Sequence, residues 1–237
     1  MDDFQQFERP DTSIAVRDSL TTLIVAAVFD LALAQEIERA LRHQHAVAVL
    51  LFDIDDLSQI NCDHGWGVGD RLLERMGILA RRFFRTHDWV ARHGDDAIAV
   101  LLPETTLDQA ALLAARFREM VQQRFVLDDQ RTKRGKPVTV SAAALGSDLV
   151  QSEIDAAYIM AEAQAAVLRA KVSGRNRVER VALLPTSLTI FGAATLLGHT
   201  PREVARLIRT GALKATRRGR HFHVDRELIE SYQKTAR

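Results

Sequence analysis

The apolar residues of the chain follow two spacings, one typical of helices and one typical of buried strands. Helical spacing, with apolar residues three or four positions apart, runs over residues 20–41 and 107–125. Unbroken apolar runs cover 46–52 and 97–102, and runs of this length predict buried strands. Because helices and strands alternate, the pattern predicts an α/β domain, with a sheet that carries helices on both faces.

Further elements extend this domain. Residues 60–84 are mostly helical after a glycine-rich loop at 65–69, and the β-branched stretch 138–143 predicts a strand. A helix is expected over 153–170, ending before a Ser-Gly pair. The stretch 85–103 predicts a hairpin whose turn holds a glycine and two carboxylates. Such a turn suits a metal or a phosphate, but it is equally typical of an ordinary hairpin.

The C-terminal residues have a different pattern. Residues 187–198 predict a short capped helix, and 200–209 predict a second helix with Thr200 as its N-cap. Residues 213–224 alternate around a basic turn like a two-stranded wing, and Asp225 is expected to begin a last helix. This order predicts a small winged helix-turn-helix domain after the α/β domain.

We therefore expect an N-terminal arm or lead-in helix at 1–17, the α/β domain at 18–181, a linker at 182–186 and the winged helix-turn-helix domain at 187–237. The charge follows this division. Residues 186–237 hold ten basic and four acidic residues, a net +6, whereas the rest of the chain holds 22 basic and 27 acidic residues, a net −5. A basic tail on an acidic body favours double-stranded DNA as the partner of the tail.

Composition narrows the location of the protein. The 237 residues are 47% hydrophobic and 27% charged, which is ordinary for a globular domain. The single cysteine, Cys62, excludes an internal disulfide and indicates a reducing compartment. Residues 1–4 lack the pattern of a signal peptide, and the longest apolar run, 20–34, is interrupted and too short for a bilayer. We expect a cytoplasmic protein without a membrane partner, associated with the nucleoid when bound to DNA.

Several short motifs occur in order over about 160 residues of the α/β domain. They are Asp18-Ser19-Leu20-Thr21, Asp53-Ile54-Asp55, Asn61, Gly69-Asp70, Ala91-Arg92-His93-Gly94-Asp95-Asp96 and the stretch 170–178. In this order and spacing they resemble a GGDEF domain, the module of bacterial diguanylate cyclases. The resemblance implies an α+β sheet with helices on both faces, a role in signal transduction, and a nucleotide-binding site.

The site that the resemblance implies transfers a nucleotidyl group with two metal ions. Mg²⁺ neutralises charge while a 3′-oxygen of GTP attacks a phosphate. The assigned positions are Asp53 and Asp96 for the metal, Asn61 and Asp70 for guanine, and Lys171 and Arg175 for phosphates. From the residues alone, the alternative is that Asp53 and Asp55 cap a strand end and Asn61 is a loop residue.

Several positions depart from the family pattern. The signature reads Gly94-Asp95-Asp96-Ala97-Ile98, Ser58 replaces a phosphate-contacting lysine, and Thr22, Val25 and Ala26 replace the usual Gly, Asn and Arg of the opening motif. Asp95 adds a charge facing phosphates, worth roughly 1–4 kcal/mol of repulsion at about 4 Å. Each lost stabilising group costs about 10²- to 10³-fold in rate. We therefore expect no enzyme activity, no catalytic residue and no required cofactor or metal, with residual GTP and Mg²⁺ binding left open at a vestigial site.

Just ahead of the signature, Arg85 and Asp88 form an Arg-x-x-Asp motif. In the family this motif is the inhibitory site for cyclic di-GMP, and Arg116 matches the second arginine that completes it. Guanidinium groups pair with guanine or phosphate edges and stack on purines, and Asp88 suits the guanine N–H groups. The resemblance thus implies cyclic di-GMP as a ligand. The alternative is a surface salt bridge between Arg85 and Asp88.

Residues 187–235 resemble the excisionase and MerR-type winged-helix DNA-binding fold. The arginines expected to contact DNA are Arg202, Arg206 and Arg209 on the second helix and Arg217, Arg218 and Arg220 on the wing. The first three share a face that suits the major groove or its phosphates, while Val204, Leu207 and Ile208 are expected to pack inward. A merely solvated charged face is the alternative. His221 and His223 lack a third metal ligand, so no metal site is expected there.

Together these features predict a cyclic di-GMP-responsive DNA-binding transcription regulator with a degenerate GGDEF domain. We expect a homodimer in which the ligand bridges the Arg-x-x-Asp sites of two chains. One alternative is a weakly active diguanylate cyclase with a DNA-binding domain, which GTP turnover would reveal. The other is a ligand-independent DNA-binding or scaffold protein, which would respond to no guanine nucleotide.

Overall fold

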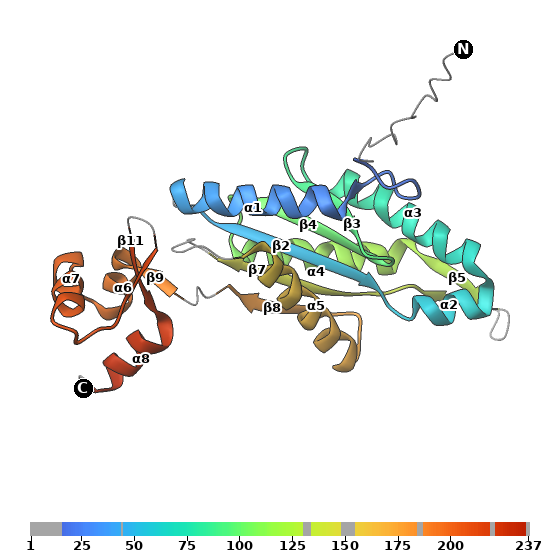
Figure 1. Ribbon diagram of the computed structural model, residues 1–237. Helices are drawn as coiled ribbons and strands as arrows, with labels where there is room; N and C mark the ends of the chain where they lie inside the picture. The colour runs from blue at the N-terminus through green and yellow to red at the C-terminus, as the bar shows by residue number, and fades with distance from the viewer. Residues whose placement is uncertain are drawn as a thin grey trace, which may run out of the picture.

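The computed structural model describes residues 16–43, 45–129, 134–147, 155–183, 187–218 and 221–235. Along the chain, a unit built on a six-stranded sheet is followed by a small unit built on a three-stranded sheet (Figure 1). Several sequence predictions fall wholly or partly outside the described residues: most of the arm at 1–17, the first two residues of the helix at 153–170, part of the linker at 182–186, and Arg220 on the wing.

The large sheet has the strand order β1-β3-β4-β2-β7-β8. Its strands are β1 (Ile24–Val25), β2 (Val47–Ile54), β3 (Trp89–His93), β4 (Ala97–Pro103), β7 (Val140–Ser147) and β8 (Val178–Ala182). The outer pairs β1–β3 and β7–β8 are parallel, and the inner pairs are antiparallel. Asp53 alone among the residues of β2 is not fully buried, which explains why this central strand reads as an unbroken apolar run.

Helices cover both faces of this sheet. They are α1 (Ala26–His43) and α5 (Ala156–Val172) on one face, and α3 (Trp66–Phe83) and α4 (Leu107–Arg124) on the other, with α2 (Leu57–His64) leading into α3. Even-numbered residues of β2 join the core under α3 and α4, whereas its odd-numbered residues from 47 to 51 join the core under α1 and α5. The predicted α/β domain with helices on both faces is confirmed.

The first helix begins later than its apolar spacing predicts. The predicted span was 20–41, but α1 starts at Ala26 because the residues before it form a turn. The carboxylate of Asp18 accepts hydrogen bonds from the backbone N–H and the hydroxyl of Thr21, both at 2.7 Å, and Thr22 has a φ of 57°. Side-chain bonds of this kind compete with helix formation.

Some strands were missed or misplaced by the sequence pattern. The missed ones are β1, β8 and a hairpin of β5 (Val126–Asp129) with β6 (Arg134–Pro137). The strand expected over 138–143 starts two residues later and runs to Ser147. These segments either are very short or lie at the edge of the sheet, where a partly buried strand gives little apolar signal.

The second unit holds strands β9 (Ser187–Thr189), β10 (Thr216–Arg218) and β11 (His221–Asp225) and helices α6 (Ile190–Leu197), α7 (Pro201–Arg209) and α8 (Arg226–Thr235). Strand β11 lies between β10 and β9. The helix predicted over 187–198 is wrong for its first three residues, because buried Leu188 pairs with Val224 in the sheet. Asp225 likewise ends β11 instead of beginning the last helix.

Capping residues define where helices α6 and α7 begin and where α6 ends. The hydroxyl of Thr189 accepts a hydrogen bond from the N–H of Gly192 at 3.3 Å, and Gly198 ends α6 with a φ of 69°. Thr200 and Glu203 then form a capping box at the start of α7. Among the helices of the described segments, none is both long and apolar enough to cross a bilayer.

Candidate functional site

The register of β2 against β4 brings two of the predicted carboxylates together. Asp53 lies opposite Ala97, so Asp96 stands beside the end of β2. Burial raises the pKa of Asp53 to about 6. The neighbouring Asp96 and Asp55 contribute to this rise in pKa, and the hydrogen bond and charge of Lys171 oppose it. Two carboxylates that lie close together and are partly buried form a site with affinity for a cation.

The last turn of α5 and the loop after it supply positive charge near Asp53 and Asp56. Lys171, in the last turn of α5, lies with its Nζ 2.6 Å from Oδ1 of Asp53. Arg175 lies with its Nε 3.0 Å from Oδ1 of Asp56, the residue that precedes α2. The structure thus places Lys171 and Arg175 next to the loop that follows β2. Both are held by carboxylates and would have to exchange these partners to bind phosphate.

Asp55 holds this loop in position. Its carboxylate accepts hydrogen bonds from the hydroxyls of Thr139 and Ser141, both at 2.6 Å, and from the backbone N–H of Asn176 at 3.1 Å. The side-chain oxygen of Asn176 accepts a further hydrogen bond at 2.6 Å from Arg118 on α4. Sequence reasoning missed Asn176 and Arg118, since no local pattern connects residues that lie more than fifty positions apart.

Strain in this loop is confined to two neighbouring residues. Arg175 and Asn176 have φ values of 60° and 47°, in the left-handed region. Asparagine adopts such a conformation with little cost, but arginine adopts it at a cost of about 1–3 kcal/mol. The hydrogen bond from the backbone N–H of Asn176 to Asp55 therefore helps to hold the adjacent backbone of Arg175 in a conformation that an isolated loop would not favour.

The backbone of the signature hairpin at 94–98 accommodates Asp95 better than the sequence predicts. Gly94 has a φ of 73°, whereas Asp95 has an ordinary φ, so an aspartate fits the second position without backbone strain. The guanidinium of Arg92 donates to the backbone oxygen of Asp95 at 2.8 Å and pairs with Asp18 at 3.1 Å. Asp95 itself is exposed. Water around its carboxylate weakens the repulsion that was expected toward phosphates.

The two residues assigned to guanine lie on one short segment. A Cβ on Gly69 would lie 2.0 Å from Oδ1 of Asn61, so the side chain of Asn61 packs directly on Gly69. Within the described residues, this buried oxygen has no hydrogen-bond partner. Asp70 is exposed immediately beyond. The geometry therefore brings Asn61 next to Asp70, at the start of α3.

The Arg-x-x-Asp motif lies at the other end of β3. Asp88 accepts a hydrogen bond at 2.8 Å from the backbone N–H of Arg85, and its side chain is 3% exposed. In the described part of the chain, the exposed guanidinium of Arg85 has no ion pair, so the alternative of an Arg85–Asp88 salt bridge is wrong. Arg116 is also exposed, and the contact between Phe84 and Phe117, with centroids 5.4 Å apart, brings their two neighbours, Arg85 and Arg116, to one region.

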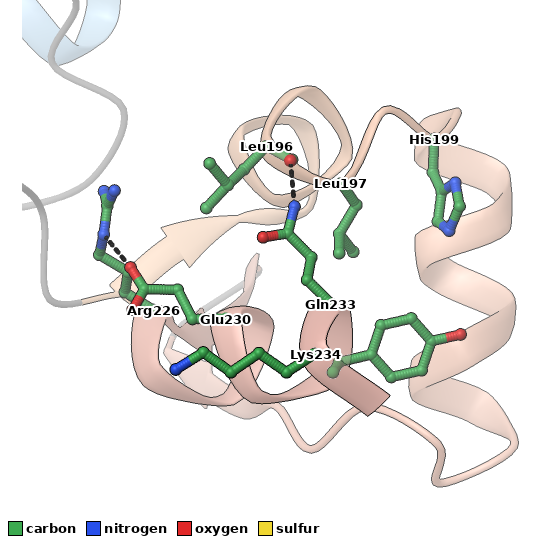
Figure 2. A pocket seen from close by; sticks show the side chains of 8 residues that line it. Leu196, Leu197, His199, Arg226, Glu230, Gln233 and Lys234 are labelled. Atoms are coloured by element: carbon green, nitrogen blue, oxygen red, sulfur yellow. Dashed lines mark hydrogen bonds and ion pairs between the residues drawn. The ribbon is translucent and has the colours of Figure 1, made fainter. Parts of the chain in front are cut away.

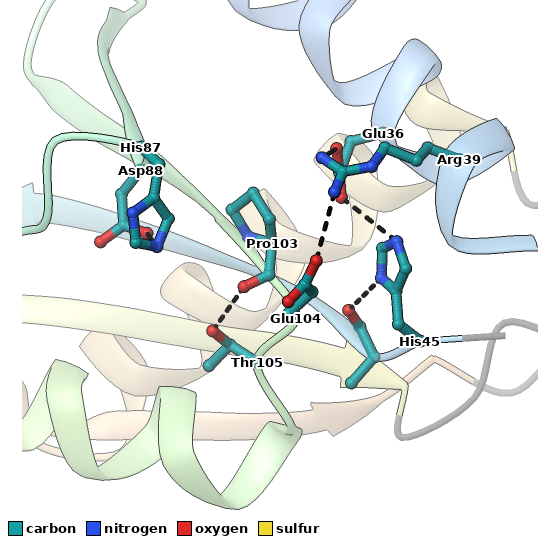
Figure 3. Close-up of polar contacts among 9 residues, drawn as sticks. Glu36, Arg39, His45, His87, Asp88, Pro103, Glu104 and Thr105 are labelled. Atoms are coloured by element: carbon teal, nitrogen blue, oxygen red, sulfur yellow. Dashed lines mark hydrogen bonds and ion pairs between the residues drawn. The ribbon is translucent and has the colours of Figure 1, made fainter. Parts of the chain in front are cut away.

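A polar network lies at this end of the sheet (Figure 3). Arg39 on α1 pairs with Glu104 at 3.2 Å and with Glu36 at 3.5 Å. His45 lies with its Nε2 3.8 Å from Glu36. These contacts tie α1 to the turn after β4. Asp88 directly precedes β3 at this end of the sheet, whereas Asp53 and Asp96 lie at the opposite end.

In the second unit, α7 presents its predicted arginines to solvent. Arg202, Arg206 and Arg209 are exposed, whereas Val204 is fully buried. Of the wing residues, Arg217 is exposed. A groove of about 630 Å³ lies between the end of α6 and α8 (Figure 2). Its lining residues include Leu196, His199, Arg226, Tyr232 and Lys234, and Gln233 crosses it to donate a hydrogen bond at 2.7 Å to the backbone oxygen of Leu196.

Several curated relatives of the chain are named diguanylate cyclases. It is 30% identical over 168 residues to diguanylate cyclase DgcP of Pseudomonas aeruginosa, a match that covers 70% of this chain and 24% of that protein. It is 29% identical over 136 residues to diguanylate cyclase A of Treponema denticola, covering 57% of this chain and 35% of that protein. The chain thus spans about a quarter to a third of the length of these curated relatives.

Solved structures show the same fold. Diguanylate cyclase SiaD of Pseudomonas aeruginosa, in complex with its activator SiaC, is 28% identical with a TM-score of 0.61, covering 71% of this chain and 62% of that chain. The coiled coil and GGDEF domain of DgcB from Caulobacter crescentus, in complex with c-di-GMP, is 25% identical with a TM-score of 0.62, covering 71% of this chain and 85% of that chain.

The comparisons contradict the expectation that the chain is not an enzyme. That expectation rested on the substitutions at Ser58, Asp95 and Ala97. However, Asp53 and Asp96 still converge, and Asp95 is accommodated without strain. Lost groups alone do not decide activity, because the two carboxylates and the lysine that remain still lie together.

The family assignment rests on the first unit. Residues 15–177 match the family described as diguanylate cyclase, GGDEF domain. This match includes the strands and loops that carry Asp53, Asp96 and Lys171. It extends over more than half of the chain. The chain therefore belongs to the GGDEF family of diguanylate cyclase domains.

Proposed function

We propose that the chain is a diguanylate cyclase of low rate, which joins GTP molecules into cyclic di-GMP and carries a DNA-binding domain at its C-terminus. The observation that supports this function best is the convergence of Asp53 and Asp96 with Lys171 at one end of the sheet. In the reaction, a bond forms between a 3′-oxygen of one GTP and the α-phosphorus of another, and pyrophosphate leaves as the bond to its oxygen breaks.

The carboxylates suit Mg²⁺. This ion is usually held by one or two carboxylates together with substrate phosphates. Asp53 and Asp96 provide two carboxylates whose repulsion helps to raise the pKa of Asp53, and a cation would relieve that repulsion. Within the described residues, no group of three or more His, Cys, Asp or Glu side chains forms an all-protein site. When bound, the ion would neutralise charge on the phosphates.

The other side chains have supporting roles in this proposal. Lys171 and Arg175 would leave their carboxylate partners to hold phosphate oxygens, and Asn61 with Asp70 would hydrogen-bond the guanine edge. Ser58 and Ala97 supply no charge where the family pattern has a lysine and an acid. Each such group contributes about 10²- to 10³-fold in rate. We therefore expect turnover well below that of a domain with the full signature.

Turnover of GTP with Mg²⁺, followed by mass spectrometry of the products, tests the proposal. The neighbours Asp95 and Asp96 provide a matched pair of variants. Asp96→Asn should abolish product formation, because it removes a metal carboxylate. Asp95→Asn should retain or increase it, because that side chain is exposed. Equal activity in the two variants would refute the assignment of Asp96.

We further propose that Arg85, Asp88 and Arg116 bind cyclic di-GMP. The support is the buried carboxylate of Asp88, held by the backbone N–H of Arg85, together with the exposed Arg85 and Arg116, whose neighbours Phe84 and Phe117 are in contact. Calorimetry with cyclic di-GMP should show binding that Arg85→Ala removes and that Arg82→Ala, a change at an exposed arginine of α3, leaves intact. Retained binding by Arg85→Ala would refute this site.

The proposal for the C-terminal unit is that α7 enters the major groove of DNA. Its support is the exposed arginine face opposite Val204, on a helix that follows a tight turn. Arg206→Ala should weaken binding to a DNA duplex and reduce the slope of log affinity against log salt by about one. Arg226→Ala, which breaks an ion pair with Glu230 on α8, is the control.

A further inference from the structure

Helix α5 is apolar on two opposite sides. Its inner side packs on the sheet through Ile159, Met160, Ala163, Ala166, Val167 and Ala170. At about 100° per residue, another apolar row lies on the opposite side. This outer row consists of Tyr158, Ala161, Ala165, Leu168 and Val172. A helix on the surface of a domain normally has a polar outer side, so the outer row requires an explanation.

The outer row is exposed and regularly spaced. Tyr158, Leu168 and Val172 are 45%, 62% and 81% exposed. The five positions are separated by three, four, three and four residues, which is the spacing of the a and d positions in a coiled coil. Single exposed apolar residues are common and need no partner. Five in this register form the seam along which one helix packs against another.

We infer that the outer row of α5 packs against the outer row of α5 in a second copy of this chain, with the two helices antiparallel. In this register Tyr158 packs against Leu168 of the partner subunit, and Ala161 packs against Ala165 of the partner subunit. The small alanines lie nearest the two-fold axis, where they allow the helices to approach closely. The segment from Tyr158 to Leu168 is thus complementary to itself, as a two-fold interface requires, and Val172 lies beyond it.

Charges beside the row favour the same arrangement. Asp155, at the start of α5, comes next to Arg169 of the partner subunit, and both residues are exposed. The two-fold axis repeats this attraction, whereas the repulsion between Glu162 and Glu162 of the partner subunit occurs only once, near the axis. In a parallel pair Arg169 would lie beside Gln164 of the partner subunit and gain no opposite charge.

This pairing depends on neither nucleotide nor DNA. It uses the outer side of α5, whereas Asp88 and Arg116 lie beside α3 and α4 on the opposite face of the sheet. Failure of the proposed cyclic di-GMP or DNA sites would therefore leave the pairing unchanged. A dimer without added ligand is the expected state of the chain at micromolar concentrations.

Sedimentation velocity of the full chain without nucleotide tests this interface. Leu168→Glu and Leu112→Glu form a matched pair, because both leucines are 62% exposed and lie on helices of the first unit. Leu168→Glu should raise the dimer dissociation constant at least about 100-fold, since the axis repeats the loss of a buried leucine in both chains. Leu112→Glu should leave it unchanged, and far-UV circular dichroism should show that both variants are folded.

A cross-linking experiment decides the orientation even if Leu168→Glu does not fold. In a background with Cys62→Ser, chains carrying Ala161→Cys are mixed with chains carrying Ala165→Cys under mild oxidation. The antiparallel register predicts a disulfide between the two kinds of chain in preference to either kind with itself. A monomer at all concentrations, equal effects of both glutamates, or cross-links only between identical chains would overturn the inference.

Discussion

Replacing Asp53 by asparagine probes the electrostatics of the site. In the folded chain the pKa of Asp53 is raised from 3.8 to about 6, first by burial and then by its carboxylate neighbours. Below about pH 4 the carboxyl is protonated in the folded and the unfolded chain, so it costs no stability. Between about pH 4 and pH 6 the unfolded chain ionises first. The stability of the wild-type chain therefore falls over this range, and the cost stays constant above it.

The size of the effect follows from the pKa. The pKa of Asp53 differs by about two units between the folded and the unfolded chain, which corresponds to roughly 3 kcal/mol of unfolding free energy. The side chain is only 16% exposed, so solvent screens little of this. Asparagine removes the cost but leaves Lys171 without its anion. We expect the stability of Asp53→Asn relative to the wild type to rise by about 1–3 kcal/mol from pH 4 to pH 7, while cyclase activity is lost.

Urea unfolding at about pH 4 and pH 7 measures this gain. Asp95→Asn is the control, because Asp95 is exposed and its replacement should change stability by the same small amount at both pH values. A difference between Asp53→Asn and the wild type that does not change with pH would refute the argument.

Three further changes test other parts of the fold. Asp55→Ala should cost about 3 kcal/mol in urea unfolding, because it leaves one buried and two partly buried donors without their acceptor; a loss under about 1 kcal/mol would contradict this. Gly69→Ala should weaken GTP binding in calorimetry, since the new Cβ would displace Asn61, and unchanged affinity would contradict the guanine assignment. Phe117→Ala should cost about 3–5 kcal/mol of unfolding free energy, as its buried ring packs on Phe52 at 4.7 Å.

The sequence predicts the centre of the fold better than its edges. Strands β2 and β4 are buried on both faces, so their apolar runs are unbroken and easily recognised. Strand β9 has only three residues, and the last of them, Thr189, is the N-cap of α6, so its residues look like the start of a helix. Strand β6 contains Arg134, Gly135, Lys136 and Pro137, which have low β-propensity and are paired only because β5 lies alongside.

The candidate site, like the fold, was only partly predictable from the sequence. The order of the motifs led to the assignment of Asp53, Asp96 and Lys171. The sheet register brings the two aspartates together, and the end of α5 places Lys171 beside Asp53. The position of Asp55 at the centre of a hydrogen-bond network was not predictable, since its donors lie 84 to 121 residues away. The conclusion that activity is lost went wrong for a related reason. Substitutions are visible in a sequence, whereas the exposure of Asp95 and its unstrained backbone are properties of the fold.

The formation of cyclic di-GMP from GTP and Mg²⁺ by the full chain tests the central claim most directly. The wild-type chain and Asp96→Asn, purified in parallel, are compared by mass spectrometry over a long incubation. We predict that cyclic di-GMP accumulates slowly with the wild-type chain, at about one molecule per two GTP consumed, and stays at background with Asp96→Asn. Product at background with both proteins would contradict a working site at Asp53 and Asp96.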